Sequence, residues 1–260
     1  MPARTRLNKF LRDCHLGSRR KCELLVEQGL VTINGEVVSE IGTLVDPMVD
    51  VVEVRNEEVA PVVERFYVAA YKPRGTVVTA SDPQERETVF QAIGDLPEGS
   101  FTVGRLDMES EGLLLLTNDG KLSHRLSHPR FAVERVYEVE INGSIGKEVA
   151  GRLTDGVELD DGIAKAKCVE VLRQGGGTSA LMITLTEGKK REIRRMMAAC
   201  GHEVTFLKRT RFGTATIGDL KPGEWRHLTR DEVRGLRRIV EEAYLTKLKG
   251  AEAEENSHNH

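Results

Sequence analysis

The sequence has 260 residues but no long apolar segment, few aromatic residues (5%) and only four cysteines. No run approaches the roughly 18 consecutive apolar residues of a membrane-spanning helix, and the N-terminus lacks the apolar core of a signal peptide. The cysteines form no Cys-x-x-Cys pair, so neither a structural zinc site nor a disulfide framework is expected. A Walker loop and a Gly-x-Gly-x-x-Gly motif are also absent. These absences favour a cytoplasmic protein that uses no metal and no cofactor.

The charged residues, 30% of the chain, are segregated along it. Basic residues gather in the segments 4–21 and 189–211, whereas the stretch 36–64 is acidic. The net charge of −3 conceals this pattern. Two basic segments on a nearly neutral protein indicate a polyanionic partner, although two solvated helix faces would give the same composition.

The N-terminal part predicts two short helices followed by a hairpin. Apolar residues recur at helical spacing over 7–11, and Ser18 can cap a second helix that ends near Gly29. The dipeptide Asn34-Gly35 between two β-rich runs is a strong hairpin signal. The first turn of the second helix carries Arg19, Arg20 and Lys21. Because cations oppose the helix dipole there, these charges indicate contact with something outside the domain.

From Phe66 onward, strand-like and helix-like segments alternate and hairpin signals recur, which predicts an α+β domain with a mixed, largely antiparallel sheet. The expected strands are "RFYVAAYK", "GTVVTA" after a Pro-Gly turn, "SFTVGRLD", "GLLLLTND", "RVYEVEIN" and the hairpin "AKCVEVLRQ"/"SALMITLTEG". The expected helices are "IGKEVAGRLTDG", "KREIRRMMAACG" and "TRDEVRGLRRIVEEAYL", the last with a capping box. The predicted domains are therefore 1–63 and 64–247, with a disordered tail over 248–260.

Long motifs carry a resemblance to known families. The segment "RLNKFLRDCHLGSRRKCELLVEQGLVTINGEVV" resembles the RNA-binding module named after ribosomal small-subunit protein four, also called the alpha-L motif. The second domain resembles the pseudouridine synthases of the RsuA/RluB type, in the family's own order. The motifs are "YKPRG", "GRLDMESEGLLLLTNDG", "RVYEV", "EGKKREIRRM" and "LKRTRFGTATIGDLKPGEWRHLT".

The resemblance implies isomerisation of uridine in ribosomal RNA, with three catalytic residues. Asp107 matches the nucleophilic aspartate, Tyr137 the active-site tyrosine and Arg194 the arginine that pairs with the aspartate. These residue types suit the chemistry: a carboxylate can attack a sugar carbon, a neighbouring arginine keeps it ionised in a water-poor pocket, and an aromatic ring can support an unstacked base. We expect Asp107 at the end of a strand, where a rigid element would aim it.

Several basic residues are predicted to bind substrate or RNA. Arg105 is compatible with contact to RNA or to its own loop, and Lys72 with a place in the pocket or in a turn. The others are candidate phosphate contacts or solvated charges: Lys189, Lys190, Arg191, Arg195, Arg19, Arg20 and Lys21. His124 and His128 have a metal-compatible spacing but no acidic third ligand nearby, so a structural role is expected.

The sequence departs from the family pattern at three positions, with Tyr71 in place of a frequent Asn, Arg135 of Lys and Glu192 of Gln. None removes an expected catalytic group. The predicted function is site-specific isomerisation of uridine by a monomer, with large-subunit (23S) ribosomal RNA as the preferred partner. The alternatives are the same chemistry on small-subunit (16S) RNA, a non-catalytic assembly factor that binds ribosomal RNA and, less consistent with the basic N-terminal module, a glycosidase.

Overall fold

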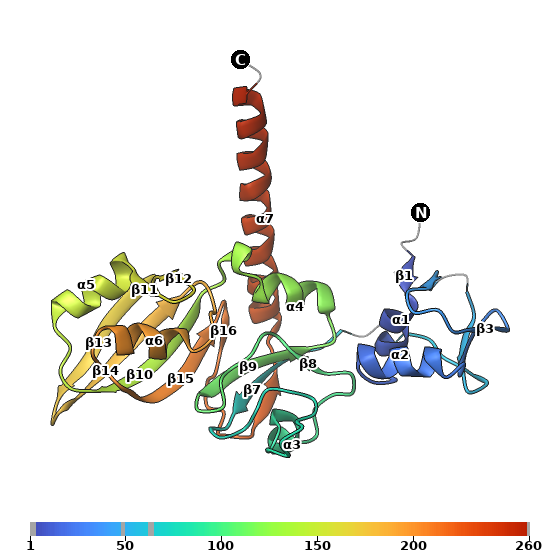
Figure 1. Cartoon of the computed structure of the whole chain (residues 1–260), viewed down its shortest axis with the longest axis horizontal. Helices are drawn as coiled ribbons and strands as arrows, with labels where there is room; N and C mark the ends of the chain where they lie inside the picture. The colour runs from blue at the N-terminus through green and yellow to red at the C-terminus, as the bar shows by residue number, and fades with distance from the viewer. Residues whose placement is uncertain (1–3, 48–49, 62–64, 259–260) are drawn as a thin grey trace. The chain divides into compact units, whose positions relative to one another are not determined.

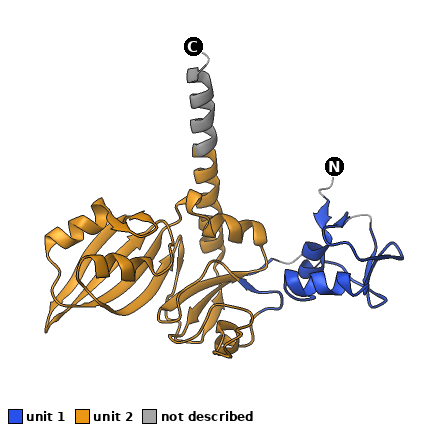
Figure 2. Ribbon diagram, viewed as in Figure 1, with its two compact units in different colours: residues 1–66, 97–101 blue, residues 67–96, 102–260 orange. Residues whose placement is uncertain are grey.

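The computed structural model describes residues 4–47, 50–61 and 65–258, with side chains described as far as residue 246. The chain forms two compact units (Figure 2), Met1–Phe66 with Pro97–Phe101, and Tyr67–Leu96 with Thr102–His260. The boundary predicted between residues 63 and 64 falls within 62–64, outside the described residues.

The N-terminal unit has the predicted helices and hairpin. Helix α1 spans Leu7–Asp13, and α2 spans Arg19–Glu27 with the Ser18 side chain accepting a hydrogen bond from the Lys21 amide. Strands β2 (Val31–Ile33) and β3 (Glu36–Val38) form the hairpin about Asn34-Gly35, and β5 (Val52–Val54) and β6 (Glu57–Glu58) complete a sheet in the order β3-β2-β5-β6. Strands β1 (Thr5–Arg6) and β4 (Leu44–Val45) pair separately. The helices and strands share an apolar core that includes Leu11, Cys22 and Val31.

The second unit is built on a nine-stranded sheet, whose main path runs β13-β14-β10-β15-β9-β7-β17 (Figure 1). Along the main path every strand pair is antiparallel except β15 with β9, so the predicted mixed, largely antiparallel sheet is confirmed. The strands on this path are β13 (Cys168–Gly175), β14 (Thr178–Leu185), β10 (Arg135–Asn142), β15 (Val204–Phe212), β9 (Glu111–Thr117), β7 (Tyr67–Lys72) and β17 (Trp225–His227). Strands β8 (Phe101–Thr102) and β16 (Ala215–Thr216) pair with β9 and β15, and β11 (Val157–Leu159) and β12 (Gly162–Ala164) form a separate hairpin.

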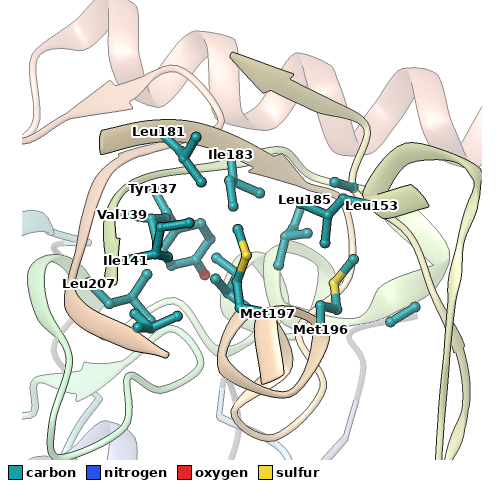
Figure 3. Close-up of a cluster of buried hydrophobic side chains, with 14 of the residues drawn as sticks. Tyr137, Val139, Ile141, Leu153, Leu181, Ile183, Leu185, Met196, Met197 and Leu207 are labelled. Atoms are coloured by element: carbon teal, nitrogen blue, oxygen red, sulfur yellow. The ribbon is translucent and has the colours of Figure 1, made fainter. Parts of the chain in front are cut away.

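Two apolar clusters stabilise this unit. One joins β10, β14 and β15 to the helices α5 (Lys147–Asp155) and α6 (Glu192–Ala199), with Met196 and Met197 at its centre (Figure 3). The other joins β7 and β9 to α4 (Gly120–Ser127), the 3₁₀ turn η1 (Pro129–Phe131) and α7 (Arg230–His258). A short helix α3 (Val89–Ile93) follows the Thr88 capping box. These clusters fix the positions of the strands and of helix α6, which together border the candidate site.

Three segments differ from the sequence-based expectation. Residues 76–80, predicted as a strand, form no ladder, and Val77 makes only an isolated bridge to Thr88. In "SFTVGRLD" only Phe101–Thr102 is a strand, and the remainder is a loop. Helix α7 continues to His258, so the backbone of 248–258 is helical where a disordered tail was expected. Alanine and glutamate favour helix even without an apolar stripe, and the prediction weighed only the stripe.

Candidate active site

A cavity of about 270 Å³ lies between the loop 103–110, the start of α6 and strands β10 and β15. Asp107 and Tyr137, two of the three residues predicted to be catalytic, both line it. Four of the predicted RNA-binding residues also line it: Arg105, Lys189, Lys190 and Arg191. The tertiary structure therefore brings motifs more than 80 residues apart in the sequence to a single cavity.

Asp107 lies in a loop and not at a strand end as expected, because β8 ends at Thr102 and β9 begins at Glu111. The fully buried Lys72 holds this loop in place. Its Nζ atom donates to the carbonyl oxygens of Pro73 (2.9 Å), Ser110 (2.8 Å) and, more weakly, Met108 (3.4 Å). The loop that carries Asp107 is thus held by a side chain of the "YKPRG" motif, and Lys72 is not among the residues that line the cavity.

The environment of Lys72 disfavours the charged form of its side chain. Burial lowers the pKa of Lys72 to about 8, with the positive charge of Arg209 adding to the effect and the carboxylates of Asp107 and Glu111 opposing it. A buried ammonium that donates to two or three carbonyl oxygens is stabilised by those bonds as well as by nearby anions. Lys72 is therefore both the anchor of the loop and a cation in electrostatic contact with Asp107.

Arg194, the third predicted catalytic residue, holds the same loop from the other side. Its guanidinium donates to the carbonyl oxygens of Val204 (2.8 Å) and Glu109 (3.2 Å), and its Nε atom lies 3.7 Å from the Glu109 carboxylate. The expected ion pair with Asp107 does not form within the described part of the chain. Asp107 nonetheless acts on Arg194 through space, as one of the carboxylates that oppose the lowering of the Arg194 pKa by burial. The geometry makes Arg194 a residue that positions the Asp107 loop.

Tyr137 has one part in the core and one part at the cavity. Its side chain is 8% exposed and lies among the apolar residues of the cluster that contains Met196 and Met197 (Figure 3). Strand β10 is paired on both sides at this point, with Ile183 on β14 and Arg209 on β15 opposite Tyr137. The packing and the active-site interpretations are therefore compatible, because the packed ring is rigid and still borders the cavity.

The basic residues of the "EGKKREIRRM" motif divide into two groups. Lys189, Lys190 and Arg191 precede α6 at the cavity, where Arg191 pairs with Glu109 (2.8 Å) and the Lys189 ammonium donates to the Ile163 carbonyl (2.6 Å). Arg195 lies outside the cavity lining, and both its terminal nitrogens bond to the Asp161 carboxylate, at 2.7 and 3.0 Å. This ion pair weakens the expectation that Arg195 binds RNA.

The basic turn of the N-terminal unit has a different character. Arg19, Arg20 and Lys21 are exposed in the first turn of α2. None of the three forms an ion pair within the described part of the chain. Their charges are thus fully available to a polyanion, as the sequence indicated.

His124 and His128 make local contacts. Their ring centroids lie 5.4 Å apart, and the Nδ1 atom of His128 accepts a hydrogen bond from the Arg130 amide (3.1 Å). Among residues 4–47, 50–61 and 65–246, no group of three or more His, Cys, Asp or Glu side chains is arranged to hold a metal ion. Over those residues, too, no helix is long and apolar enough to cross a membrane.

Comparison with known proteins places both units in families. The family described as RNA pseudouridylate synthase matches residues 66–199, and the S4 domain matches residues 5–51. An uncharacterized RNA pseudouridine synthase of Aquifex aeolicus is 40% identical over 242 residues, which cover 93% of this chain and 97% of the relative. The ribosomal large subunit pseudouridine synthase B of Bacillus subtilis is 37% identical over 239 residues, 91% of this chain and 97% of the relative.

The chain belongs to the RNA pseudouridine synthase family. A crystal structure of a pseudouridylate synthase, 28% identical, superimposes with a TM-score of 0.63 over 89% of this chain and 99% of the other. This RNA pseudouridine synthase is an isomerase of the RsuA/RluB type with an N-terminal S4 domain.

Three charged residues that line the synthase's cavity were not predicted as site residues: Arg135, Glu192 and Arg209. Arg135 and Glu192 had been noted only as departures from the family pattern. Both are buried, and Arg135 donates to the carbonyls of Leu126 and Glu187 (both 3.2 Å). Burial and the adjacent Glu187 raise the pKa of Glu192, so its side chain is closer to a neutral, glutamine-like group than its sequence letter suggests.

Tyr71, the other departure, does not line the cavity of the synthase. Its hydroxyl donates to the Glu111 carboxylate at the start of β9, and the Lys208 ammonium lies 5.8 Å from its ring centroid. Tyr71 thereby ties β7 to β9 beside the Asp107 loop. Arg209 lies in the "LKRTRFG" motif, which could have marked it as a site residue. A basic residue on a strand is, however, expected to be exposed unless the adjacent strands of the sheet are known.

Proposed function

We propose that this synthase isomerises a specific uridine to pseudouridine in ribosomal RNA, with Asp107 as the nucleophile. The observation that carries the proposal is the cavity in which Asp107 and Tyr137 meet, with the loop of Asp107 held by Lys72 and Arg194. The large-subunit RNA is the preferred substrate, because the Bacillus subtilis relative is named a large subunit pseudouridine synthase.

The residues suit each part of the isomerisation. The N1–C1′ bond of uridine breaks and a C5–C1′ bond forms, while C5 loses a proton and N1 gains one, so no atom is lost overall. An ionised Asp107 supplies the nucleophile that assists the transfer, at the sugar or at the ring. The Tyr137 ring borders the cavity as a surface for the base. A cavity of about 270 Å³ admits a single nucleotide, so the uridine enters flipped out of its helix.

The S4 domain supplies affinity and placement. Its exposed turn of Arg19, Arg20 and Lys21 offers three cations to phosphates, which position a protein on RNA without reading sequence. Lys190 and Arg191, both exposed beside the cavity, are suited to the phosphates that flank the target nucleotide.

The test is a map of modified uridines in ribosomal RNA from cells with the gene, without it, and with the Asp107→Asn form in its place. We expect one or more pseudouridines in large-subunit RNA to disappear in the second and third strains. A site lost from small-subunit RNA instead would identify that RNA as the substrate. An unchanged map accompanied by a defect in ribosome assembly would favour a non-catalytic assembly factor and contradict the proposal.

A further inference from the structure

Arg209 is the most deeply buried arginine side chain at the cavity, with 2% of its surface exposed. Its Nε atom donates to the Leu113 carbonyl at 2.7 Å. Its Nη2 atom is buried and has no hydrogen-bond partner within the described part of the chain. Buried donors are nearly always satisfied, so an unpaired donor on a residue that lines a cavity is a candidate contact for a ligand.

Strand pairing places the Arg209 side chain at the same cavity as Tyr137. Arg209 lies opposite Tyr137 across β10 and β15, so the two side chains are on the same face. The ladder shifts by one residue next to this pair, because Val136 pairs with Arg211 and Tyr137 with Arg209. As a result Arg209 and Phe212, three residues apart, both line the cavity.

On its other side, Arg209 lies against Gly112 of β9. A side chain at Gly112 would place its Cβ 2.3 Å from the Arg209 carbonyl oxygen, so only glycine permits this approach. Phe212 supports the guanidinium, whose carbon lies 5.2 Å from the ring centroid, and Arg135 lies over the same ring at 4.8 Å. Arg209 is thus held firmly, and it pairs with no carboxylate among the described residues.

The balance of charges around the cavity favours the binding of one more anion. Arg209 acts as a like charge on both Lys72 and Arg135. Asp107 and Glu111 act on Lys72, and the Tyr71 hydroxyl already engages Glu111. Glu192 acts on Arg135, and burial with the adjacent Glu187 holds the Glu192 carboxyl closer to neutral. A buried cation without an anionic partner stabilises negative charge that arises beside it.

We propose that Arg209 is a catalytic residue whose Nη2 donates a hydrogen bond to a carbonyl oxygen of the target uracil and stabilises the negative charge of the ring. The inference rests on the proposed function. When the N1–C1′ bond breaks, its electron pair stays with the uracil, which carries the charge until C5 bonds to C1′. That bond neutralises the ring, and loss of the C5 proton to a base with protonation of N1 then gives pseudouridine.

The experiment compares uridine with 5-fluorouridine at the target position of an RNA substrate, under single-turnover conditions. Fluorine makes the detached ring a weaker base, so its anion depends less on a cationic partner. Consumption of the target nucleoside, measured by digestion and chromatography, reports the bond cleavage for both substrates. We expect Arg209→Gln to slow uridine about 10²–10³-fold, the effect of losing one preorganised donor, and 5-fluorouridine about tenfold less.

The ratio of the two rates within one protein is insensitive to partial unfolding, so it remains informative if Arg209→Gln is destabilised. Arg209→Lys retains the charge and should return the ratio toward the wild-type value. Arg173→Gln is the matched control, because Arg173 is an exposed arginine of β13 that pairs with Glu140 (3.5 Å) and does not line the cavity. Its ratio and rates should equal those of the wild type.

Equal slowing of both substrates by Arg209→Gln would overturn the inference, and so would an Arg209→Lys ratio no closer to the wild type than that of Arg209→Gln. Either result would assign Arg209 to the packing of β15 or to Asp107. Failure of the proposed function is distinguishable, because in that case the wild-type protein would not isomerise uridine at all.

Discussion

Cations are used in opposite ways in the two units of this synthase. In the N-terminal unit, Arg19, Arg20 and Lys21 are exposed and carry no ion pair within the described part of the chain. In the second unit, Lys72 and Arg209 are buried and donate to backbone carbonyl oxygens. The first group can act on RNA through net charge, whereas the second acts through the geometry of individual hydrogen bonds.

This difference shows that a cluster of basic residues in a sequence can be either exposed to a polyanion or buried against the backbone. Exposed cations are interchangeable to a first approximation, because screened attraction to phosphates depends on their number. Buried cations are not interchangeable, because each donates to particular oxygen atoms in a fixed geometry. The following predictions test whether the two groups separate in experiment as they do in structure.

The largest effect is expected at Asp107, whose loop the buried Lys72 holds. Asp107→Asn should abolish isomerisation, with a loss of at least about 10⁴-fold, because an amide cannot act as the anionic nucleophile. Affinity for RNA should stay within a few-fold of the wild type. Tritium release from RNA labelled at C5 of uridine measures the first and filter binding the second. Appreciable release by the purified variant would remove Asp107 from its proposed role.

Two neighbouring arginines of α6 provide a contrast within the second unit. Arg194→Gln should lower kcat about 10²-fold, because the Asp107 loop loses its bond through the Glu109 carbonyl. Arg195→Gln should change kcat by less than about threefold, since its partner Asp161 is half exposed and surface ion pairs contribute little. Equal effects would show that the position of Arg194 at the loop has no functional consequence.

The buried ammonium of Lys72 predicts a pH dependence that the exposed cations do not share. Its pKa is lowered from 10.5 to about 8, so the rate should fall above about pH 8 as Lys72 loses a proton and a donor to the loop. Lys72→Met should be roughly tenfold slower, within the range seen for groups that orient others, and should lack this decline.

Above about pH 8 the contribution of Lys72 to the stability of the folded protein should rise, whereas the rate should fall. Between about pH 8 and 10.5 the unfolded chain holds more protons at Lys72 than the folded chain, so the contribution of this residue to stability rises with pH. The wild type should therefore gain stability relative to Lys72→Met from pH 8 to 9.5 in urea unfolding, while its rate declines. A rate and a stability that move together would contradict the assignment.

The smallest effect on catalysis is expected from the exposed turn. Replacing Arg19, Arg20 and Lys21 together by Gln should lower the magnitude of the negative slope of log affinity against log salt by about one for each lost phosphate contact. The rate at saturating RNA should not change. The double variant Arg19→Lys, Arg20→Lys preserves the charge and should preserve the slope. If the neutral triple variant keeps the wild-type slope, this turn does not face RNA.

Local patterns predicted most of the fold. The Ser18 cap, the Asn34-Gly35 hairpin, and the strands of "GLLLLTND" and "RVYEVEIN" depend on neighbouring residues and were confirmed. The strand expected at 76–80 was wrong, because β-rich composition does not supply a partner strand. The catalytic roles of Asp107, Tyr137 and Arg194 came from motif resemblance and stay predictions.

The sequence by itself determined the two RNA-related units, the mixed sheet and the candidates that meet at the cavity, because periodicity, turn chemistry and long motifs are local properties of the chain. Only the tertiary structure decided which cations are buried. Lys72 holds the Asp107 loop and Arg194 pairs with Glu109. Arg209 lies where β10, β15 and β9 meet, and its Nη2 has no partner among the described residues. Burial and hydrogen bonding depend on segments up to about a hundred residues away, which no short stretch of sequence contains.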